Sequence, residues 1–461
     1  MTALIARTGA DATRWLAGLF VLCAALGLAA GIKPEYGIAG AFALSFTVAV
    51  FANLGVGVAL FTTLSFLDIL QFGGGAVTFM KLAGLLLFLS WFARASSAPR
   101  RVTRALVTEH PGLVWSLVVF LGWSTISLAW ATSRSLVIFQ TYSLLLDSLL
   151  LPIVFAAVNE RRDALMIVVA FIIGAIGSAT YGLVHPLPAS AQDAGRLAGA
   201  LGEANQQATV LVAAIALSLA VLGAARRSPL LLLLTILGAF LAFFGLVDTL
   251  SRAGLLSFGC VLLAGVFVGG RWRPYFVVLT LVAVGAVAVY YFAVASVNAK
   301  DRVTMTDTSG RTSLWTVGLR AFEAHPILGV GSDNFQDVSI HYLDRPGEIA
   351  EAQVIVDTPK VVHNIYLEQL ADLGIPGLIT LLAVFGYVLA AAWKAARIFE
   401  RVGDRQLELL SRCTILALVG FMTADFFASE LTSKQLWIVI ALCPALLKLA
   451  RTAERQSFAT A

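Results

Sequence analysis

Long apolar stretches separated by short polar segments repeat along almost the whole chain. A membrane-spanning helix needs about 20 mostly apolar residues. Residues 37–53 and 54–70 have almost no loop between them, so one of these two is expected to be a half-membrane or kinked element. The pattern predicts an all-α, polytopic integral membrane protein with about 12, and at most 14, transmembrane helices. The candidate spans are residues 15–32, 37–53, 54–70, 76–94, 112–130, 136–157, 163–183, 205–224, 228–248, 253–269, 274–296, 374–395, 411–428 and 434–450.

One polar segment, residues 297–373, is much longer than the other connections. A loop of this length without structure of its own is uncommon. Apolar residues at helical spacing in 312–324 predict a helix with one buried face, which Pro326 should end near His325. We expect this helix to lie flat at the membrane surface as a lid. The chain thus divides into N-terminal spans (1–296), a large loop with short helices (297–373) and C-terminal spans (374–461).

Composition excludes a soluble protein and explains the basic charge. The chain is 59% hydrophobic and 13% charged, whereas soluble domains carry about 25% charged residues. The net charge of +5 does not require a nucleic acid partner, because cytoplasmic loops of membrane proteins are enriched in Lys and Arg. With 94–104 in the cytoplasm, alternation brings every other dense basic cluster to the same side, together with both termini. These clusters are 161–162, 226–227, 271–273 and 394–405.

Nothing in the sequence indicates a metal or a cofactor. There is no Asp-x-Asp motif, no P-loop and no dinucleotide fingerprint. His325 and His341 do not have zinc-ligand spacing. The cysteines lie in apolar segments without metal or redox spacing and are expected to be small buried apolar residues. They are Cys23, Cys260, Cys413 and Cys443.

Three arginines stand on the outer side, where basic residues are least expected. Arg196, Arg252 and Arg311 come from three separate outer loops. Any one of them could extend to a lipid phosphate. Together they predict a shared anion site, because the planar guanidinium binds phosphate oxygens bidentately and keeps its charge near lipid.

His363 and Asn364 open the helix that follows the large loop. Ionisable groups at this depth are functional candidates, and a histidine with a pKa near 6.5 is suited to act as a general base at neutral pH. A single histidine is, however, more often structural. Glu368 and Asp372 lie on one helical face, and the simplest interpretation of both is a hydrated helix end.

Four motifs in order resemble the core of the O-antigen ligase and O-antigen polymerase superfamily, over about residues 196–380. They are SRAG (251–254), SGRTSLW (309–315), HPILGVGSDNF (325–335) and HNIYLEQLADLGIPGL (363–378). The resemblance implies a GT-C-like glycosyltransferase of the bacterial inner membrane, usually with about twelve spans and one large periplasmic loop. Its essential histidine matches His363 and its arginines match Arg252 and Arg311. Arg196 matches more loosely, because the usual pattern is stretched here.

The resemblance also implies a reaction. A ligase of this kind moves a polysaccharide from undecaprenyl diphosphate onto lipid A-core, without metal and with inversion. His363 would act as the general base, and Arg252 and Arg311 would stabilise the leaving diphosphate. The active site would face the periplasm. The further residues expected to bind substrate are Arg196, Asn334, Asn364, Tyr366 and Glu368.

Three alternatives remain open at this stage. O-antigen polymerases and protein O-glycosyltransferases share the motifs, although the short tail after the last span weighs against the latter. A more distant alternative is a lipid or solute transporter. A transporter is expected to contain paired repeats or matched broken helices, and the sequence suggests neither.

Overall fold

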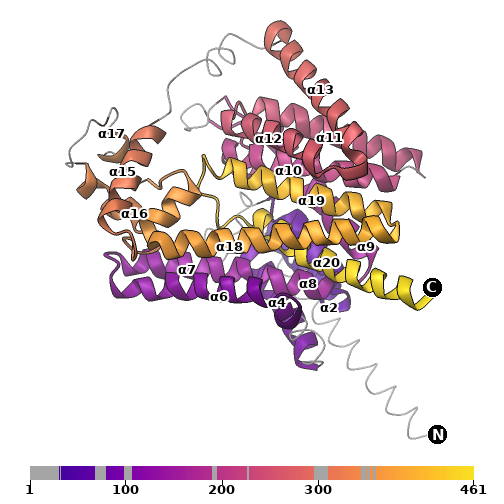
Figure 1. Ribbon diagram of the computed structural model, residues 1–461, viewed down its shortest axis with the longest axis horizontal. Helices are drawn as coiled ribbons and strands as arrows, with labels where there is room; N and C mark the ends of the chain where they lie inside the picture. The colour runs from indigo at the N-terminus through magenta and orange to yellow at the C-terminus, as the bar shows by residue number, and fades with distance from the viewer. Residues whose placement is uncertain are drawn as a thin grey trace, which may run out of the picture.

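The computed structural model describes residues 31, 33–67, 79–97, 106–188, 195–225, 228–294, 310–343, 349, 353–356 and 360–460, and it is helical throughout this part (Figure 1). The helices before the large loop are α2 (Pro34–Ala52), α3 (Leu54–Leu64), α4 (Phe79–Ser97), α6 (Pro111–Ile126), α7 (Arg134–Ser148), α8 (Leu150–Ala157), α9 (Arg161–Val184), α10 (Ala204–Ala225), α11 (Pro229–Asp248), α12 (Arg252–Val268) and α13 (Arg273–Val289). The later ones are α15 (Arg311–Ala324), α16 (Phe335–Val338), α17 (Gln353–Val356), α18 (Ile365–Val402), α19 (Arg405–Ala424) and α20 (Lys434–Thr460).

The predicted all-helical, multi-pass class is confirmed. Within the described residues, nine helical segments are long and apolar enough to cross a membrane, and three shorter apolar helices accompany them. The expected half-membrane element corresponds to α3, which has only 11 residues. The predicted span 15–32 lies almost entirely outside the described residues. The described residues therefore support a polytopic membrane protein, and the total of about 12 spans stays a prediction.

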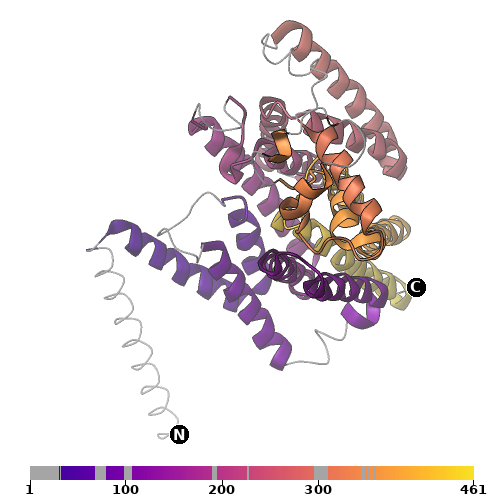
Figure 2. The same cartoon turned by 90° about the vertical axis from the view of Figure 1, so that its left-hand side faces the viewer.

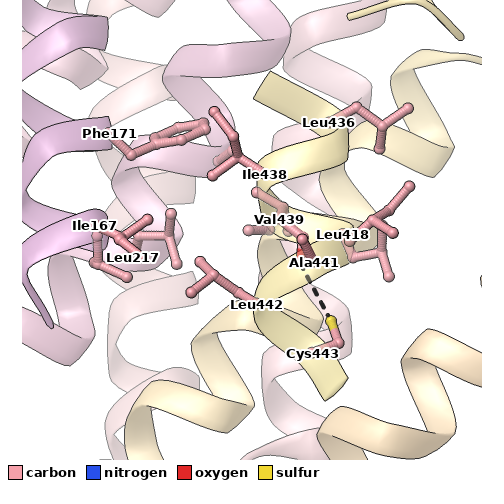
Figure 3. Packing of buried hydrophobic residues seen from close by; sticks show 14 of the residues in the cluster. Ile167, Phe171, Leu217, Leu418, Leu436, Ile438, Val439, Ala441, Leu442 and Cys443 are labelled. Atoms are coloured by element: carbon pink, nitrogen blue, oxygen red, sulfur yellow. Dashed lines mark hydrogen bonds between the residues drawn. The ribbon is translucent and has the colours of Figure 1, made fainter. Parts of the chain in front are cut away.

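The core of the bundle lies around α10, α19 and α20. In each of these helices 78–83% of the most apolar window is buried by other parts of the protein, against 11% in the segment containing α13. Figure 3 shows Phe171 and Leu217 facing Ile438 and Leu442 of α20. Alanines and glycines in these helices allow close approach of the backbones, which is how helices associate where lipid removes the hydrophobic driving force. The outward-facing α13 projects at the edge of the bundle (Figures 1 and 2).

Ion pairs join the helix ends on the side that the basic-residue pattern places in the cytoplasm. They connect segments that are far apart in sequence but were assigned to the same side. This agreement supports the alternation of the spans and places the large loop at the opposite end. The pairs are Glu109–Arg451, Arg161–Asp404, Arg271–Glu408 and Arg401–Glu454.

The described residues of the large loop form a small helical cap over the other end of the bundle, with an apolar core that includes Leu314, Val317 and Phe335. Figure 2 looks onto this end and shows the cap in front of the spans. α15 runs from Arg311 to Ala324 and ends with His325 as its C-cap, as the position of Pro326 predicted.

A glycine-rich turn fastens the cap to α18. The N–H groups of Val330 and Gly331 donate to the carbonyls of Ala371 and Asp372, at 2.9 and 2.8 Å. α18 itself breaks at Gly374, where φ is 66° and ψ is −164°. The break falls in the Gly-Ile-Pro-Gly sequence of residues 374–377, where Pro376 also lies inside the helix.

Candidate functional site

His363 lies at the outer end of α18 in a strained conformation. Its φ is 53°, a region that non-glycine residues rarely adopt and that is often found at functional sites. The following residue, Asn364, caps the helix: its side-chain oxygen accepts from the N–H groups of Tyr366 and Leu367 at 3.0 and 3.1 Å. Asn364 thus fixes the backbone next to His363. Its side-chain oxygen binds two N–H groups of the protein itself.

His363 is neutral at physiological pH. Burial, followed by the positive charges of Arg311 and Lys360, lowers the pKa of His363 to about 4. The imidazole therefore has a free nitrogen lone pair to accept a proton or a hydrogen bond.

The three predicted arginines come together next to this histidine. Burial, then the charge of Arg252, then that of Arg196, lower the pKa of Arg311. Both charges act on Arg311, and a cluster of positive charges of this kind favours a bound anion. Arg311 also acts on His363, so histidine and arginines share one site.

Two of the arginines occupy the first position of a helix. Arg252 begins α12, whose N-cap Ser251 accepts from the N–H of Gly254, and Arg311 begins α15 after Gly310, whose φ is 72°. Free N–H groups and the positive end of the helix dipole favour anions at such positions. Local structure therefore adds to the charge of the side chains.

Asn205 links the other loops of the arginine site, and sequence reasoning did not find it. Its side-chain oxygen accepts from Arg196 Nη2 at 3.0 Å and from Ser251 Oγ at 2.9 Å. Arg196 Nε donates in addition to the Thr249 carbonyl at 2.9 Å. These contacts hold Arg196 close to the start of α12, where Arg252 lies.

The carboxylates of α18 are buried, so the expectation of a hydrated helix end was wrong. Glu368 is 5% exposed and accepts a hydrogen bond from Ser429 Oγ. Asp372 is 2% exposed and accepts from the N–H groups of Asp333 and Phe335 at 2.8 and 2.9 Å. Asp372 thereby holds the turn of the cap. That turn packs over the helix and covers the carboxylate that was expected to contact water.

Asp425, at the end of α19, is the most unusual polar group near the site. It is fully buried, and within the described residues neither carboxylate oxygen has a hydrogen-bond partner. Its carbonyl accepts from the N–H of Ile365, which places it against the start of α18. In the sequence, an acidic residue at the end of an apolar span gives no indication that its carboxylate is buried.

The two remaining predicted site residues have partners within the protein. Asn334 is fully buried and bonds both the N–H and the carbonyl of Ser133, which ties the cap to the connection between α6 and α7. Tyr366 donates from its hydroxyl to the Met422 carbonyl at 2.7 Å. Tyr366 also lines an apolar cavity of about 550 Å³ together with Phe426 and Phe427. Its role in binding substrate stays a prediction, as does that of Asn334.

No group of three or more His, Cys, Asp or Glu side chains that could hold a metal ion is found in the described parts of the chain.

Fold and site together define a multi-pass membrane protein with an anion-attracting site at one end, built from helix ends and the cap. Residues 237–382 match the family model described as O-antigen ligase (Wzy_C). The matched region includes Arg252, Arg311 and His363, while Arg196 precedes it. The family comprises membrane enzymes of the ligase and polymerase type. No curated protein matches the chain.

Proposed function

We propose that the protein is an O-antigen ligase, an inverting and metal-independent glycosyltransferase that moves a polysaccharide from undecaprenyl diphosphate onto lipid A-core. The observation that carries this proposal is the convergence of Arg196, Arg252 and Arg311 beside a neutral His363. The domain match supports a lipid-linked glycan as the substrate class.

The arginines would hold the diphosphate of the donor. As the bond between the anomeric carbon and the diphosphate oxygen breaks, negative charge grows on the leaving group. Charges fixed in position before the reaction stabilise that growth most, because they need no reorganisation. The helix N-termini at Arg252 and Arg311 would also favour the negative charge of the diphosphate.

His363 would accept the proton of the acceptor hydroxyl as its oxygen attacks the anomeric carbon. Direct displacement inverts the configuration at that carbon. A general base contributes about 10²- to 10⁴-fold to the rate. The bound diphosphate also offsets the charge of Arg311, which raises the basicity of His363 once the donor is in place.

The polyprenyl chain would lie in the apolar cavity beside Tyr366. This cavity is lined by side chains of α12, α18 and α19, among them Leu256, Leu389 and Val419. Tyr366, which lies three residues after His363 in the sequence, would connect this cavity to the site that holds the diphosphate. An isoprenoid needs such an apolar surface and few polar contacts.

The site would face the periplasm of a bacterial inner membrane. The ion-paired end carries the basic clusters and is assigned to the cytoplasm, which leaves the cap on the outer side. ATP and nucleotide sugars are absent there, and a lipid-linked diphosphate carries its own driving force.

The test is transfer by the purified protein, supplied with an undecaprenyl-diphosphate glycan and rough lipopolysaccharide in the presence of EDTA. We expect glycan on the lipopolysaccharide core. Lengthening of the lipid-linked glycan instead would show a polymerase, and transfer to a peptide would show a protein O-glycosyltransferase. Absence of any transfer by folded protein would contradict the proposal.

A further inference from the structure

A cavity of about 670 Å³ lies at the end of the bundle opposite the arginine site. This volume is in the range of small-molecule sites. The walls are the junction between α2 and α3, the last turns of α4, and the turn from α8 into α9. Arg161, which pairs with Asp404, directly precedes the lining residue Arg162. The cavity therefore lies at the end that the basic clusters place in the cytoplasm, and the proposed transfer reaction does not use it.

Two arginines line this cavity. Arg94 Nη2 donates to the carbonyls of Phe51 and Ala52, the last residues of α2, at 2.8 and 3.2 Å. A guanidinium has five N–H donors, so these two bonds leave donors for a further ligand. Arg162, in the first turn of α9, is exposed. Both side chains can therefore bind the oxygens of an anionic group.

Two carboxylates line the same cavity, and their printed partners are backbone N–H groups. Glu160 and Asp163 form the capping box of α9. One oxygen of Asp163 accepts from the N–H groups of Asn159 and Glu160, at 2.9 and 3.0 Å. These bonds fix the carboxylates without neutralising their charge. The lining thus carries two positive and two negative side chains, which suits a ligand with one group of each sign.

Trp91 adds a donor without an acceptor. Its side chain lines the cavity and the residue is 8% exposed, yet its Nε1 has no hydrogen-bond partner among the described residues. A buried indole N–H usually has a partner. Trp91 lies three residues before Arg94 on α4, so both belong to one face of that helix. A ligand with acceptor oxygens in the cavity would supply the missing partner.

We propose that this cavity binds the headgroup of a phospholipid that carries both a phosphate and a primary ammonium, as in phosphatidylethanolamine. Arg94, Arg162 and the indole N–H of Trp91 bind the phosphate. The carboxylate of Glu160 accepts from the ammonium. This proposal does not rest on the proposed function, because the site lies at the other end of the protein and takes no part in transfer.

The surroundings favour a membrane lipid over a free phosphate. Phe51 directly precedes the lining residue Ala52, and Phe92 directly follows Trp91. Their side chains are 46% and 54% exposed. Exposed aromatic residues on membrane-spanning helices contact acyl chains, and polar pockets between helix ends on the cytoplasmic side bind lipid headgroups. A phospholipid uses both the polar cavity and the apolar faces of α2 and α4.

The experiment measures lipid binding to the purified full chain by native mass spectrometry in detergent. Phosphatidylethanolamine, phosphatidylglycerol and phosphatidylcholine with the same acyl chains are compared. Phosphatidylethanolamine should bind about tenfold more tightly than phosphatidylcholine, whose quaternary ammonium has no N–H to donate to a carboxylate. Phosphatidylglycerol has no ammonium and should also bind more weakly. Excess inorganic phosphate should leave bound phosphatidylethanolamine in place.

Three variants test the separate contacts. Arg162→Gln should weaken binding of all three lipids about tenfold, because the phosphate loses a charged donor. Trp91→Phe keeps the aromatic ring without the N–H and should weaken binding about threefold. Glu160→Gln keeps a side-chain oxygen that can cap α9 and should remove the preference for phosphatidylethanolamine over phosphatidylglycerol.

Matched controls use the same substitutions elsewhere. Arg455→Gln changes an exposed arginine of α20 at the same end, and Trp393→Phe changes a tryptophan of α18 that is 42% exposed. Both should bind lipid as the natural protein does. All variants should keep the melting temperature of the natural protein in detergent without lipid, which shows that they are folded.

Equal binding of the three lipids would overturn the proposal, and so would unchanged binding of phosphatidylethanolamine by both Arg162→Gln and Trp91→Phe. Tighter binding of phosphatidylglycerol, or displacement of the lipid by inorganic phosphate, would show a plain anion site instead. The assay measures binding and not transfer, so its failure leaves the proposed function standing, and absence of transfer leaves the lipid site standing.

Discussion

The N–H of Ile365 donates a 2.9 Å hydrogen bond to the carbonyl of Asp425. This bond joins the first turn of α18, two residues after His363, to the end of α19. It also holds the Asp425 carboxyl inside the protein, where burial and the charge of Glu368 raise its pKa well above the usual value. A group that is this unfavourable for folding is a candidate for function.

Asp425→Asn should separate stability from activity. The amide removes a buried group whose oxygens lack partners among the described residues, so the melting temperature should stay equal or rise. Transfer should fall at least about tenfold if the carboxyl supports the site. Asp337→Asn, on an exposed residue of the cap, is the control and should alter neither. Full activity of Asp425→Asn would leave its burial without a functional reason.

Replacing His363 should remove transfer without unfolding the protein. Asparagine tolerates the positive φ of 53° but has no basic nitrogen, so His363→Asn should lose about 10²- to 10⁴-fold in kcat. His341→Gln changes an exposed histidine of the same cap and should keep full activity. Unchanged transfer by His363→Asn, at normal protein level, would refute the assignment of the base.

The pH profiles should differ between the free enzyme and the complex. Because the pKa of His363 in the empty site is about 4, kcat/KM should not fall through loss of this base between pH 7 and 5. The bound diphosphate raises that pKa, so kcat should fall at a higher pH than kcat/KM does. Coincident profiles would show that the donor does not act on His363.

The same lowered pKa predicts how stability depends on pH. The unfolded chain protonates His363 near pH 6.5, whereas the folded protein does so near pH 4. The stability linked to this group is therefore present above pH 6.5 and is lost as pH falls towards 4. Thermal unfolding in detergent should show a smaller acid loss for His363→Asn than for the natural protein.

Lysine at position 311 is not expected to support the transfer activity that Arg311 supports. If the guanidinium binds two phosphate oxygens, Arg311→Lys should lose most of its transfer activity although the charge remains. Arg397→Lys, on a side chain that is 62% exposed at the opposite end of the bundle, should be silent. Near-normal activity of Arg311→Lys would indicate that charge alone is needed.

Gly374 should tolerate no side chain. Its φ and ψ lie in a region that is almost restricted to glycine, and an added Cβ would lie 2.3 Å from the Ile327 carbonyl oxygen. Gly374→Ala should therefore cost about 2 kcal/mol or more and loosen the cap. Gly386→Ala, in the same helix with no atom within 4 Å of the new Cβ, should be neutral or slightly stabilising. Equal melting temperatures would contradict the role of the break.

The sequence alone predicts the membrane class, most of the spans and the helix at 312–324, and it singles out the three arginines and His363 as candidate site residues. It could do so because apolar length and the scarcity of outer basic residues are local signals. Which polar groups are shielded from water depends on the tertiary structure. Glu368 and Asp372 looked like a wet helix end, but the turn of the cap and Ser429 cover them. Whether a carboxylate is hydrated depends on segments that pack over it from far along the chain. For this reason the burial of Asp425 became visible only in the fold, which places it against the start of α18.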